Sequence, residues 1–327
     1  MYWQLLSSRV SCVVAASAAI AFAGCTGPNA PAEQPTADVQ AEVATWWQPK
    51  PGEHKDWDWQ ITEPYDLSAA RSVYDLDMFD LAPAGSYLEQ ANGTRITVPA
   101  GPLAGKLDEL HARTPRAIVI CYLDTGAWED YRPDASVFPG ASGSLPNRPT
   151  APQAGSVIGW DTGWDGERWL DLRRATRSAF APIIWARLDL AVRMGCDAVE
   201  PDQNNPLDND PGFNITLEDQ LTWYEEVAAQ AHARGLSVGM KNGHDQSGAA
   251  RRLVTSFDWA LPEECGEFDE CGELAPFITA QKAVFAVDYA TGGSTSTACK
   301  RQRAAGLLDG LLKDEPPSSA RRVQCAP

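Results

Sequence analysis

The sequence predicts an α/β fold, and within that class a single (β/α)8, or TIM, barrel domain. About eight strand-and-helix repeats follow one another along the chain, which suits a closed barrel better than an open doubly wound sheet. Polar side chains recur where the predicted strands end, as is typical of the face on which barrel enzymes carry their sites. No glycine-rich nucleotide fingerprint follows any strand, so a Rossmann or P-loop fold is not indicated.

The individual elements follow from hydrophobic periodicity and from end signals. Apolar residues at helical spacing predict helices over 103–113, 180–194 and 217–234, and Gly195 and Gly235 stand where C-cap glycines belong. Short apolar or β-branched runs predict the strands. These lie at 57–61, 72–79, 116–123, 196–200, 236–242, 257–261 and 283–287, and a last segment, 301–313, closes the domain.

The N-terminal segment has the features of a targeting sequence. Residues 1–24 contain one charge and an apolar run, and the small residues before Cys25 resemble a bacterial lipoprotein signal. We therefore expect cleavage before Cys25 and a lipid on that cysteine, rather than ordinary secretion. Residues 25–45 predict a flexible tether, and 46–327 form the barrel domain, held on the outer face of the cell membrane.

The charge balance limits the possible partners. The chain has 27 basic and 44 acidic residues, a formal net charge of −17, which disfavours nucleic acids and anionic lipid surfaces. A neutral or cationic ligand is easier to attract, although acidity also serves solubility outside the cell. We expect a monomer that contacts the membrane only through its lipid.

Six cysteines remain after Cys12 and Cys25 are set aside, and in an exported protein we expect disulfides. Cys265 and Cys271 bracket a short loop and are expected to pair. Cys299 and Cys325 are expected to tie down the C-terminal segment. Cys121 and Cys196 lie in predicted core strands, where they either pair or act as small buried hydrophobes. The four histidines do not form a zinc pattern with the cysteines, so no metal and no cofactor is predicted.

A set of polar residues lies at or just after the predicted strand ends and supplies the candidate substrate contacts. These are Gln60, Asp77, Asp124, Glu200, Lys241, Asp288 and Tyr289. The long stretch from Thr125 to Gly159 has Trp128 at its start and is followed by Trp160 and Trp164, and indoles on such loops suit the apolar faces of sugar rings. The alternative is that one or two tryptophans of this region are core, which we expect for Trp169.

Two of the strand-end carboxylates form the best candidate catalytic pair. Asp202 follows strand 196–200, and Glu263 follows strand 257–261. Cleavage of a glycosidic bond needs one carboxyl group to protonate the leaving oxygen and a second to attack carbon or activate water. Partial burial beside Pro262 and Trp259 would raise the pKa of Glu263, as a general acid requires, while Asp202 stays ionised as the nucleophile. The two roles could also be reversed.

Several short motifs, taken in order, resemble glycoside hydrolase family 114, the endo-α-1,4-polygalactosaminidases to which spherulin-4-like proteins are related. The resemblance runs from about Trp57 to Asp314. Its motifs are Trp57-Asp58-Trp59-Gln60, Tyr74-Asp75-Leu76-Asp77, residues 116–122, Gly166-Glu167-Arg168-Trp169-Leu170-Asp171, residues 195–202 and Glu263-Glu264-Cys265.

The resemblance implies a (β/α)8 barrel whose catalytic pair matches Asp202 and Glu263. It also implies a partly deacetylated galactosamine polymer as the substrate, so that Asp77, Asp124 and Asp288 become candidates for binding ammonium groups. Lys241 would neutralise neighbouring carboxylates or bond a sugar hydroxyl. The asparagine usual after the family's aspartate is replaced here by Gln203, with Asn204 displaced by one position.

Two other functions remain open at this point. One is a lipid-anchored carbohydrate-binding surface protein with little or no turnover, against which the presence of both carboxylates argues. The other is a glycosidase for a different α-linked sugar, because sugar epimers differ by a single hydroxyl group.

Overall fold

The structure is a computed structural model that describes residues 46–142, 145, 150–246 and 248–325. The predicted signal, tether and lipidation site, Cys25, lie outside the described residues. Ala44–Pro327 form one compact unit. Within the described part, no helix combines the length and the apolar character needed to cross a membrane.

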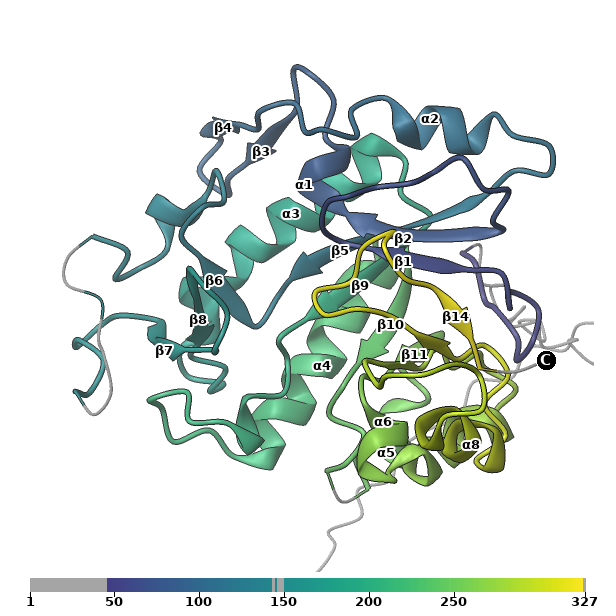
Figure 1. Ribbon diagram of the computed structural model, residues 1–327. Helices are drawn as coiled ribbons and strands as arrows, with labels where there is room; N and C mark the ends of the chain where they lie inside the picture. Colours follow the sequence, from purple (N-terminus) through teal and green to yellow (C-terminus); the bar gives the residue numbers. More distant parts are fainter. Residues whose placement is uncertain (1–45, 143–144, 146–149, 247, 326–327) are drawn as a thin grey trace, which may run out of the picture. The chain divides into compact units, whose positions relative to one another are not determined.

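A curled sheet of six parallel strands forms the centre of the fold (Figure 1). In spatial order its strands are β1 (Asp58–Gln60), β2 (Val73–Asp77), β5 (Ile118–Asp124), β9 (Ala198–Asp202), β10 (Ser237–Lys241) and β11 (Trp259–Leu261). All of them except β5 are buried along their whole length, as parallel strands covered on both faces require. The α/β class and all six of these strands therefore agree with the prediction.

The parallel pairing continues beyond β11 in a weaker form. Isolated parallel bridges join Ala260 to Val284 and Glu263 to Val287, and β12 (Val287–Asp288) pairs in parallel with β13 (Leu311–Leu312). The last strand, β14 (Val323–Gln324), is antiparallel to β13. No ladder joins β13 back to β1 in the described part of the chain, so the expected closed barrel of eight strands is observed as a curled sheet of six.

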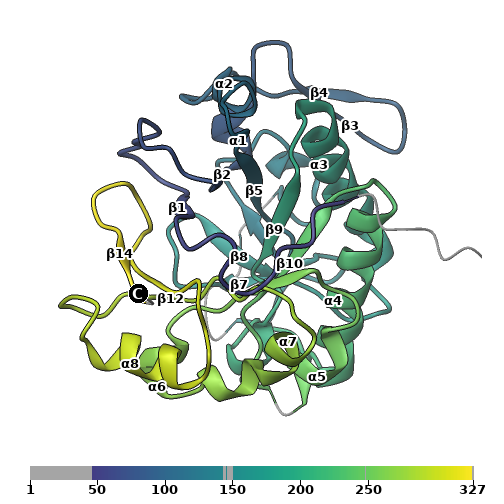
Figure 2. The same ribbon diagram turned by 90° about the vertical axis from the view of Figure 1, so that its right-hand side faces the viewer.

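Helices cover the sheet on its outer side (Figure 2). The two longest are α3 (Ala181–Met194), which ends at Gly195 with φ 93°, and α4 (Leu217–His232), which begins with a capping box between Thr216 and Asp219. The shorter helices are α1 (Met78–Leu81), α2 (Lys106–His111), α5 (Ala249–Leu253), α6 (Cys265–Phe268), α7 (Ala275–Thr279) and α8 (Thr297–Ala304). Single 3-10 turns occur at Ala135–Val137, Arg177–Ala179, Pro206–Asp208 and Cys271–Leu274.

Two small antiparallel sheets were not predicted. A hairpin joins β3 (Tyr87–Glu89) to β4 (Arg95–Thr97), and a second sheet contains β6 (Ala127–Glu129), β7 (Ile158–Asp161) and β8 (Glu167–Leu170). The second sheet organises both ends of the long stretch that the sequence suggested was a loop. It places Trp128 in the core, where its indole N–H donates to the Ala135 carbonyl, and it also buries Trp169.

All six remaining cysteines pair, as Cys121–Cys196, Cys265–Cys271 and Cys299–Cys325. The two predicted pairings are confirmed, and of the two alternatives for Cys121 and Cys196 the disulfide is the one observed. Cys121–Cys196 joins β5 to the short segment between α3 and β9, so it ties together two adjacent strands that both lead toward the same end of the sheet.

Candidate active site

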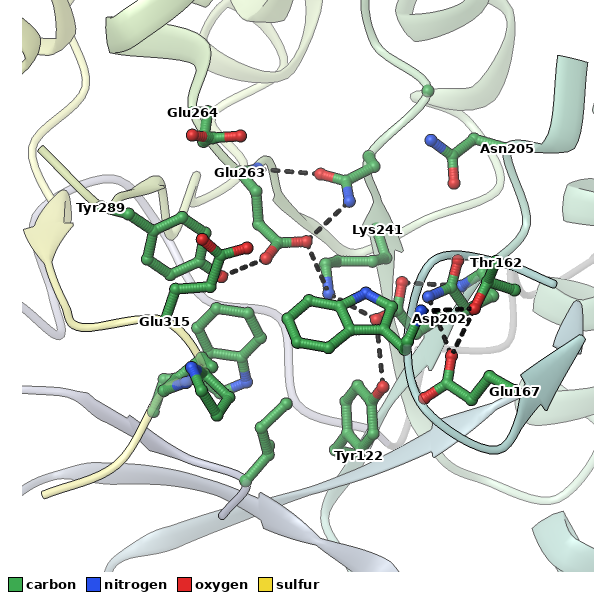
Figure 3. Close-up of a pocket in the computed structure, with 18 of the residues that line it drawn as sticks. Tyr122, Thr162, Glu167, Asp202, Asn205, Lys241, Glu263, Glu264, Tyr289 and Glu315 are labelled. Atoms are coloured by element: carbon green, nitrogen blue, oxygen red, sulfur yellow. Dashed lines mark hydrogen bonds and ion pairs between the residues drawn. The ribbon is translucent and has the colours of Figure 1, made fainter. Parts of the chain in front are cut away.

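A cavity of about 530 Å³ opens at the C-terminal ends of the parallel strands (Figure 3). Its size is within the range of small-ligand sites. Its walls carry many carboxylates and aromatic rings and few cations. The carboxylates are Asp77, Glu167, Asp202, Asp245, Glu263, Glu264, Glu270 and Glu315; the cations are Arg132 and Lys241; the aromatic residues include Trp59, Tyr122, Tyr131, Trp164, Trp169, Phe268 and Tyr289.

Lys241, the last residue of β10, is the electrostatic centre of the site. Its Nζ lies 2.8 Å from Glu200 Oε1, 2.8 Å from Asp202 Oδ2 and 3.1 Å from Glu263 Oε2. The ammonium group also lies 4.7 Å from the centre of the Trp59 ring. Burial alone would lower the pKa of Lys241, but the three carboxylates outweigh it and raise that pKa well above its ordinary value. The lysine is therefore a permanent cation shared by three anions.

Asp202, the last residue of β9, is fixed from several sides. Its Oδ2 accepts from Lys241 and from the Tyr122 hydroxyl at 3.2 Å, and its Oδ1 accepts from the backbone N–H of Gln203 at 2.6 Å. Tyr122 lies opposite Glu200 on the neighbouring strand β5, and it also donates to Asp124 at 3.1 Å. These contacts leave Asp202 oriented at the cavity wall before any ligand binds.

Glu263 follows β11 and faces Asp202 across Lys241 (Figure 3). Asn242 Nδ2 donates to its Oε2 at 2.7 Å, and the Tyr289 hydroxyl donates to its Oε1. Burial favours the neutral acid, but the charge of Lys241 and the hydrogen bonds from Tyr289 and Asn242 prevail and hold the pKa of Glu263 below its usual value. The raised pKa that we expected from its sequence neighbours is therefore not observed, because three donors meet this carboxylate.

Two buried carboxyl groups lie behind Lys241. Glu200 is fully buried, and its Oε2 accepts from the Trp59 indole N–H at 2.9 Å. Burial, followed by the repulsion of Asp202, raises the pKa of Glu200 to about 7 despite Lys241. Asp75 on β2 is also fully buried and lies against Glu200. Glu200 thus supports Lys241 from the protein interior and does not line the cavity.

A second carboxylate group lies on the side of Asp202 away from Glu263. Asp124, Glu129 and Glu167 each bring one oxygen within 4.8 Å of the others. Glu129 is paired with Arg132 at 2.5 Å and with Arg187 at 2.9 Å. Burial and the charge of Glu129 raise the pKa of Asp124 well above its ordinary value and that of Glu167 to about 7. Glu167 lines the cavity and is held by Thr162 at 3.2 Å and Gln203 at 3.3 Å.

The backbone bends sharply after each of the three strand-end residues of the site. Gln203, Asn242 and Glu264 follow Asp202, Lys241 and Glu263, and their φ angles are 60°, 49° and 56°. Left-handed backbone is uncommon for residues other than glycine and is concentrated at functional sites. The turns direct the chain away at once, which leaves the preceding side chains at the open end of the sheet.

The structure brings some of the predicted substrate contacts to the cavity and places others elsewhere. Asp77, Trp164, Lys241 and Tyr289 line it; Trp164 is 43% exposed and is available for stacking. Asp77 is already paired with Arg132 at 2.6 Å and caps α1.

The remaining candidates have structural partners away from the cavity. Gln60 bonds Asp58 and the Asp66 carbonyl, Asp124 belongs to the second carboxylate group, and Trp160 donates to the Thr150 carbonyl. Asp288 accepts from the backbone N–H groups of Gly266 and Glu267 and therefore holds the start of α6. Trp128 is a core residue, as described above.

Sequence reasoning missed four residues that shape the site. Tyr122 and Glu167 lie inside the family motifs, but the sequence does not predict that their side chains point into the cavity. Asn242 was included only as the end of a strand. His244 lines the cavity, and burial lowers its pKa to about 4, so it is neutral at physiological pH. Within the described residues, neither of its ring nitrogens has a hydrogen-bond partner.

Comparison with known families accounts for this constellation. The model of glycoside-hydrolase family GH114 matches residues 36–316. The chain belongs to this family. It is a glycoside hydrolase, as the resemblance of its motifs implied. No curated protein sequence matches it.

Two solved structures resemble the chain. The first is Aspergillus fumigatus Ega3 in complex with galactosamine, with 26% identity, a TM-score of 0.61, and coverage of 83% of this chain and 95% of that one. The second is the glycoside hydrolase domain of Pseudomonas aeruginosa PelA, as the variant E218A, with 14% identity, a TM-score of 0.51, and coverage of 83% and 99%. The second likeness concerns the fold alone.

Proposed function

We propose that this GH114 protein is an endo-acting hydrolase of α-1,4 links in a galactosamine-containing polysaccharide, with Asp202 and Glu263 as its catalytic carboxylates. The observation that carries the proposal is the meeting of these two side chains on Lys241 at the wall of one open cavity. The likeness to Ega3, whose structure holds galactosamine, supports the choice of sugar.

The charge of the cavity also supports an amino sugar. Carboxylates far outnumber cations in its lining, and its one histidine is neutral because burial lowers the pKa of His244 to about 4. A galactosamine unit without its acetyl group carries an ammonium ion, which such a cavity attracts and a cationic one would repel. Trp164, Tyr131 and Phe268 are exposed aromatic residues of the same lining and offer faces on which sugar rings stack.

The geometry favours a two-step, retaining reaction. Asp202 Oδ2 and Glu263 Oε2 both contact Lys241 Nζ, at 2.8 and 3.1 Å, so these two oxygens are separated by no more than the sum of the two distances. That limit of about 6 Å is below the separations of ~6.5–9.5 Å found in inverting enzymes.

We assign the nucleophile to Asp202 and the acid and base steps to Glu263. Asp202 is the more enclosed of the two, with 10% of its side chain exposed against 21% for Glu263, and the acid/base group must exchange protons with the leaving oxygen and with water. The lowered pKa of Glu263 suits its second role, in which the ionised carboxylate activates water.

Substitution of each carboxylate tests this assignment. Asp202→Asn and Glu263→Gln should each lose at least about a hundredfold in kcat with the fold intact, because they remove groups that act in the transition state. Asp189→Asn, which changes a surface carboxylate paired with Arg234, is the matched control and should keep full activity. Full turnover in either variant would contradict the role of that residue. Binding of the polymer by the parent protein without turnover would instead indicate a carbohydrate-binding protein.

We further propose that the fold completes the (β/α)8 barrel. The parallel bridges from β11 through β12 to β13 support this proposal, as do two contacts between the first and last parts of the sheet. The Trp57 indole donates to the Asp309 carbonyl at 2.6 Å, and Lys313 Nζ pairs with Asp58 at 2.7 Å.

We also propose that the protein is a monomer carried outside the cell on a lipid attached to Cys25. The lipid anchor is supported by the sequence before Cys25 alone, and that sequence does not bear on the monomeric state. Cys25→Ser should leave the precursor uncleaved or release the protein from membranes, as fractionation and mass spectrometry of the N-terminus would detect. A normally cleaved and membrane-bound variant would contradict it.

A further inference from the structure

The interior behind Lys241 contains a pair of carboxyl groups that the proposed reaction does not use. Asp75 in β2 and Glu200 in β9 are both 0% exposed, and neither lines the cavity. The two carboxyl groups lie within hydrogen-bonding reach of each other, and no donor from any other described residue reaches Asp75. Two ionised carboxylates have only acceptors, so one proton must be held between them.

The contacts of the two residues differ and decide where this proton lies. Glu200 Oε1 accepts from Lys241 Nζ at 2.8 Å, and its Oε2 accepts from the Trp59 indole at 2.9 Å. Within the described residues, no N–H group and no hydroxyl donates to either oxygen of Asp75. The negative charge is therefore stabilised on Glu200, and the proton belongs on Asp75.

We propose that Asp75 is a neutral carboxylic acid that donates a hydrogen bond to Glu200, and that this pair positions Lys241 between Asp202 and Glu263. Asp75 is a positioning residue, because it acts on the cavity only through Glu200 and Lys241. Burial, followed by the charge of Glu200, raises the pKa of Asp75 well above its ordinary value, in agreement with the geometry.

A neutral Asp75 lowers the negative charge that the buried cation Lys241 has to balance. If Asp75, Glu200, Asp202 and Glu263 were all ionised, Lys241 would face four negative charges, one of them without any donor. An unpaired buried charge is costly, and protonation removes it. A neutral Asp75 leaves Glu200 with three donors, so that Glu200 cannot draw Lys241 away from the two carboxylates in the cavity.

A substitution that keeps a donor can be compared with one that removes it. Asp75→Asn retains an N–H that can donate to Glu200, whereas Asp75→Leu has the same branching and no donor. The catalytic part of the test rests on the proposed function and uses a galactosamine oligomer. There Asp75→Asn should keep kcat within about threefold of the parent, and Asp75→Leu should lose about tenfold or more in kcat with little change in KM.

A second pair of measurements needs no activity and so separates a failure of this inference from a failure of the proposed function. Infrared spectra of the parent protein at neutral pH should contain the carbonyl band of a buried, protonated carboxylic acid that is absent from Asp75→Asn. Asp58→Asn is the matched control. Asp58 is a buried aspartate on the adjacent strand β1, and it pairs with Lys313 Nζ at 2.7 Å.

The unfolding temperatures of Asp75→Asn and Asp58→Asn should also differ. Asp75→Asn replaces one neutral donor by another and should unfold within about 4 °C of the parent. Asp58→Asn leaves a buried lysine without its anion and should unfold at a clearly lower temperature. An unchanged acid band in Asp75→Asn would overturn the proposal, and so would an Asp75→Asn variant as damaged in kcat as Asp75→Leu or as destabilised as Asp58→Asn.

Discussion

At the scale of single residues, the site is organised by the competition for one ammonium group. Lys241 holds Glu200, Asp202 and Glu263 at hydrogen-bonding distance. Each carboxylate also accepts from side-chain donors other than Lys241, which are Trp59 for Glu200, Tyr122 for Asp202, and Tyr289 with Asn242 for Glu263. The lysine brings the three carboxylates together, and the other donors help to set the pKa of each one.

The hydrogen bond from Tyr289 to Glu263 can be removed while the aromatic ring of residue 289 is kept. Tyr289→Phe deletes the hydroxyl that donates to Glu263, and that hydrogen bond is one of the causes that lower the pKa of Glu263. The pKa of Glu263 should therefore rise in this variant, as a carbon-13 NMR titration of its carboxyl group would show.

Tyr122→Phe is the matched control, since Tyr122 donates to Asp202 and Asp124 and not to Glu263. It should leave the titration of Glu263 close to that of the parent. An unchanged or lower pKa of Glu263 in Tyr289→Phe would show that the hydroxyl does not stabilise the ionised form.

The sequence predicted which residues stand at the strand ends but not how they ionise. Asp202, Lys241 and Glu263 were found because a strand that stops before a polar residue places it at a known edge of a parallel sheet. The pKa of Glu263 depends on Tyr289, 26 positions away in the chain, whose hydroxyl reaches it only through the pairing of Glu263 with Val287. A local sequence pattern cannot predict a contact between residues that lie this far apart in the chain.

At the scale of elements, the segment after β11 connects the site to the C-terminal part of the fold. Glu263 pairs with Val287, α6 begins at Cys265, and Asp288 accepts from the first N–H groups of that helix. The disulfide Cys265–Cys271 closes the same segment, whereas Cys299–Cys325 joins α8 to the end of the chain. The two bridges should therefore have different functions.

Removal of the two disulfides should separate stability from activity. Loop entropy predicts a loss of about 2 kcal/mol for Cys265→Ser with Cys271→Ser, and about 3.5 kcal/mol for Cys299→Ser with Cys325→Ser, because the second loop is longer. Activity should follow the opposite order, since the first bridge supports the residues next to Glu263. Denaturant unfolding and kcat of the two double variants test this, and equal losses of kcat would contradict the separate roles.

The small antiparallel sheet formed by β6, β7 and β8 shows where prediction by element failed. Its strands have three or four residues each, and partners such as Trp128 and Arg168 are 40 positions apart. Periodicity is not detectable in such short runs. For this reason the sequence alone suggests that Trp128 is a loop residue for sugar stacking, although the pairing places it in the core.

At the scale of the whole molecule, the buried acids make stability depend on pH in an unusual direction. Burial raises the pKa of Glu167 to about 7 and that of Asp309 to about 6, and it raises the pKa values of Asp75 and Asp124 well above the ordinary range. In the unfolded chain these groups ionise near pH 4–4.5, so between the two values the folded protein binds more protons. The free energy of unfolding should consequently fall as the pH rises from about 5 to about 8.

Two histidines oppose this trend, because burial lowers the pKa of His54 as well as that of His244. Burial lowers the pKa of His244 to about 4, so below its unfolded value near 6.5 the unfolded chain binds the extra proton and stability decreases with falling pH. The carboxyl groups with raised pKa values outnumber these two histidines, and the negative net charge of the chain acts in the same direction as the carboxyl groups. Unfolding temperatures measured from pH 5 to pH 8 test the net effect of these groups. An unfolding temperature that rises across this range would contradict the predicted loss of stability.

Glu167→Gln tests how much this carboxyl group of the cavity contributes to the pH dependence of stability. The substitution removes one of the raised pKa values while it keeps a group able to bond Thr162 and Gln203. The difference in unfolding temperature between pH 5 and pH 8 should become smaller in this variant. An unchanged difference would show that Glu167 ionises normally in the folded protein.

The central claim is that the acidic cavity cleaves internal α-1,4 links between galactosamine units. Mass spectrometry of the products that the purified protein releases from a defined α-1,4-galactosamine oligomer tests it most directly. We expect several shorter oligomers at the earliest times, and none from Asp202→Asn or Glu263→Gln. An intact oligomer, a release of single sugars from one end, or the same products from either variant would contradict it.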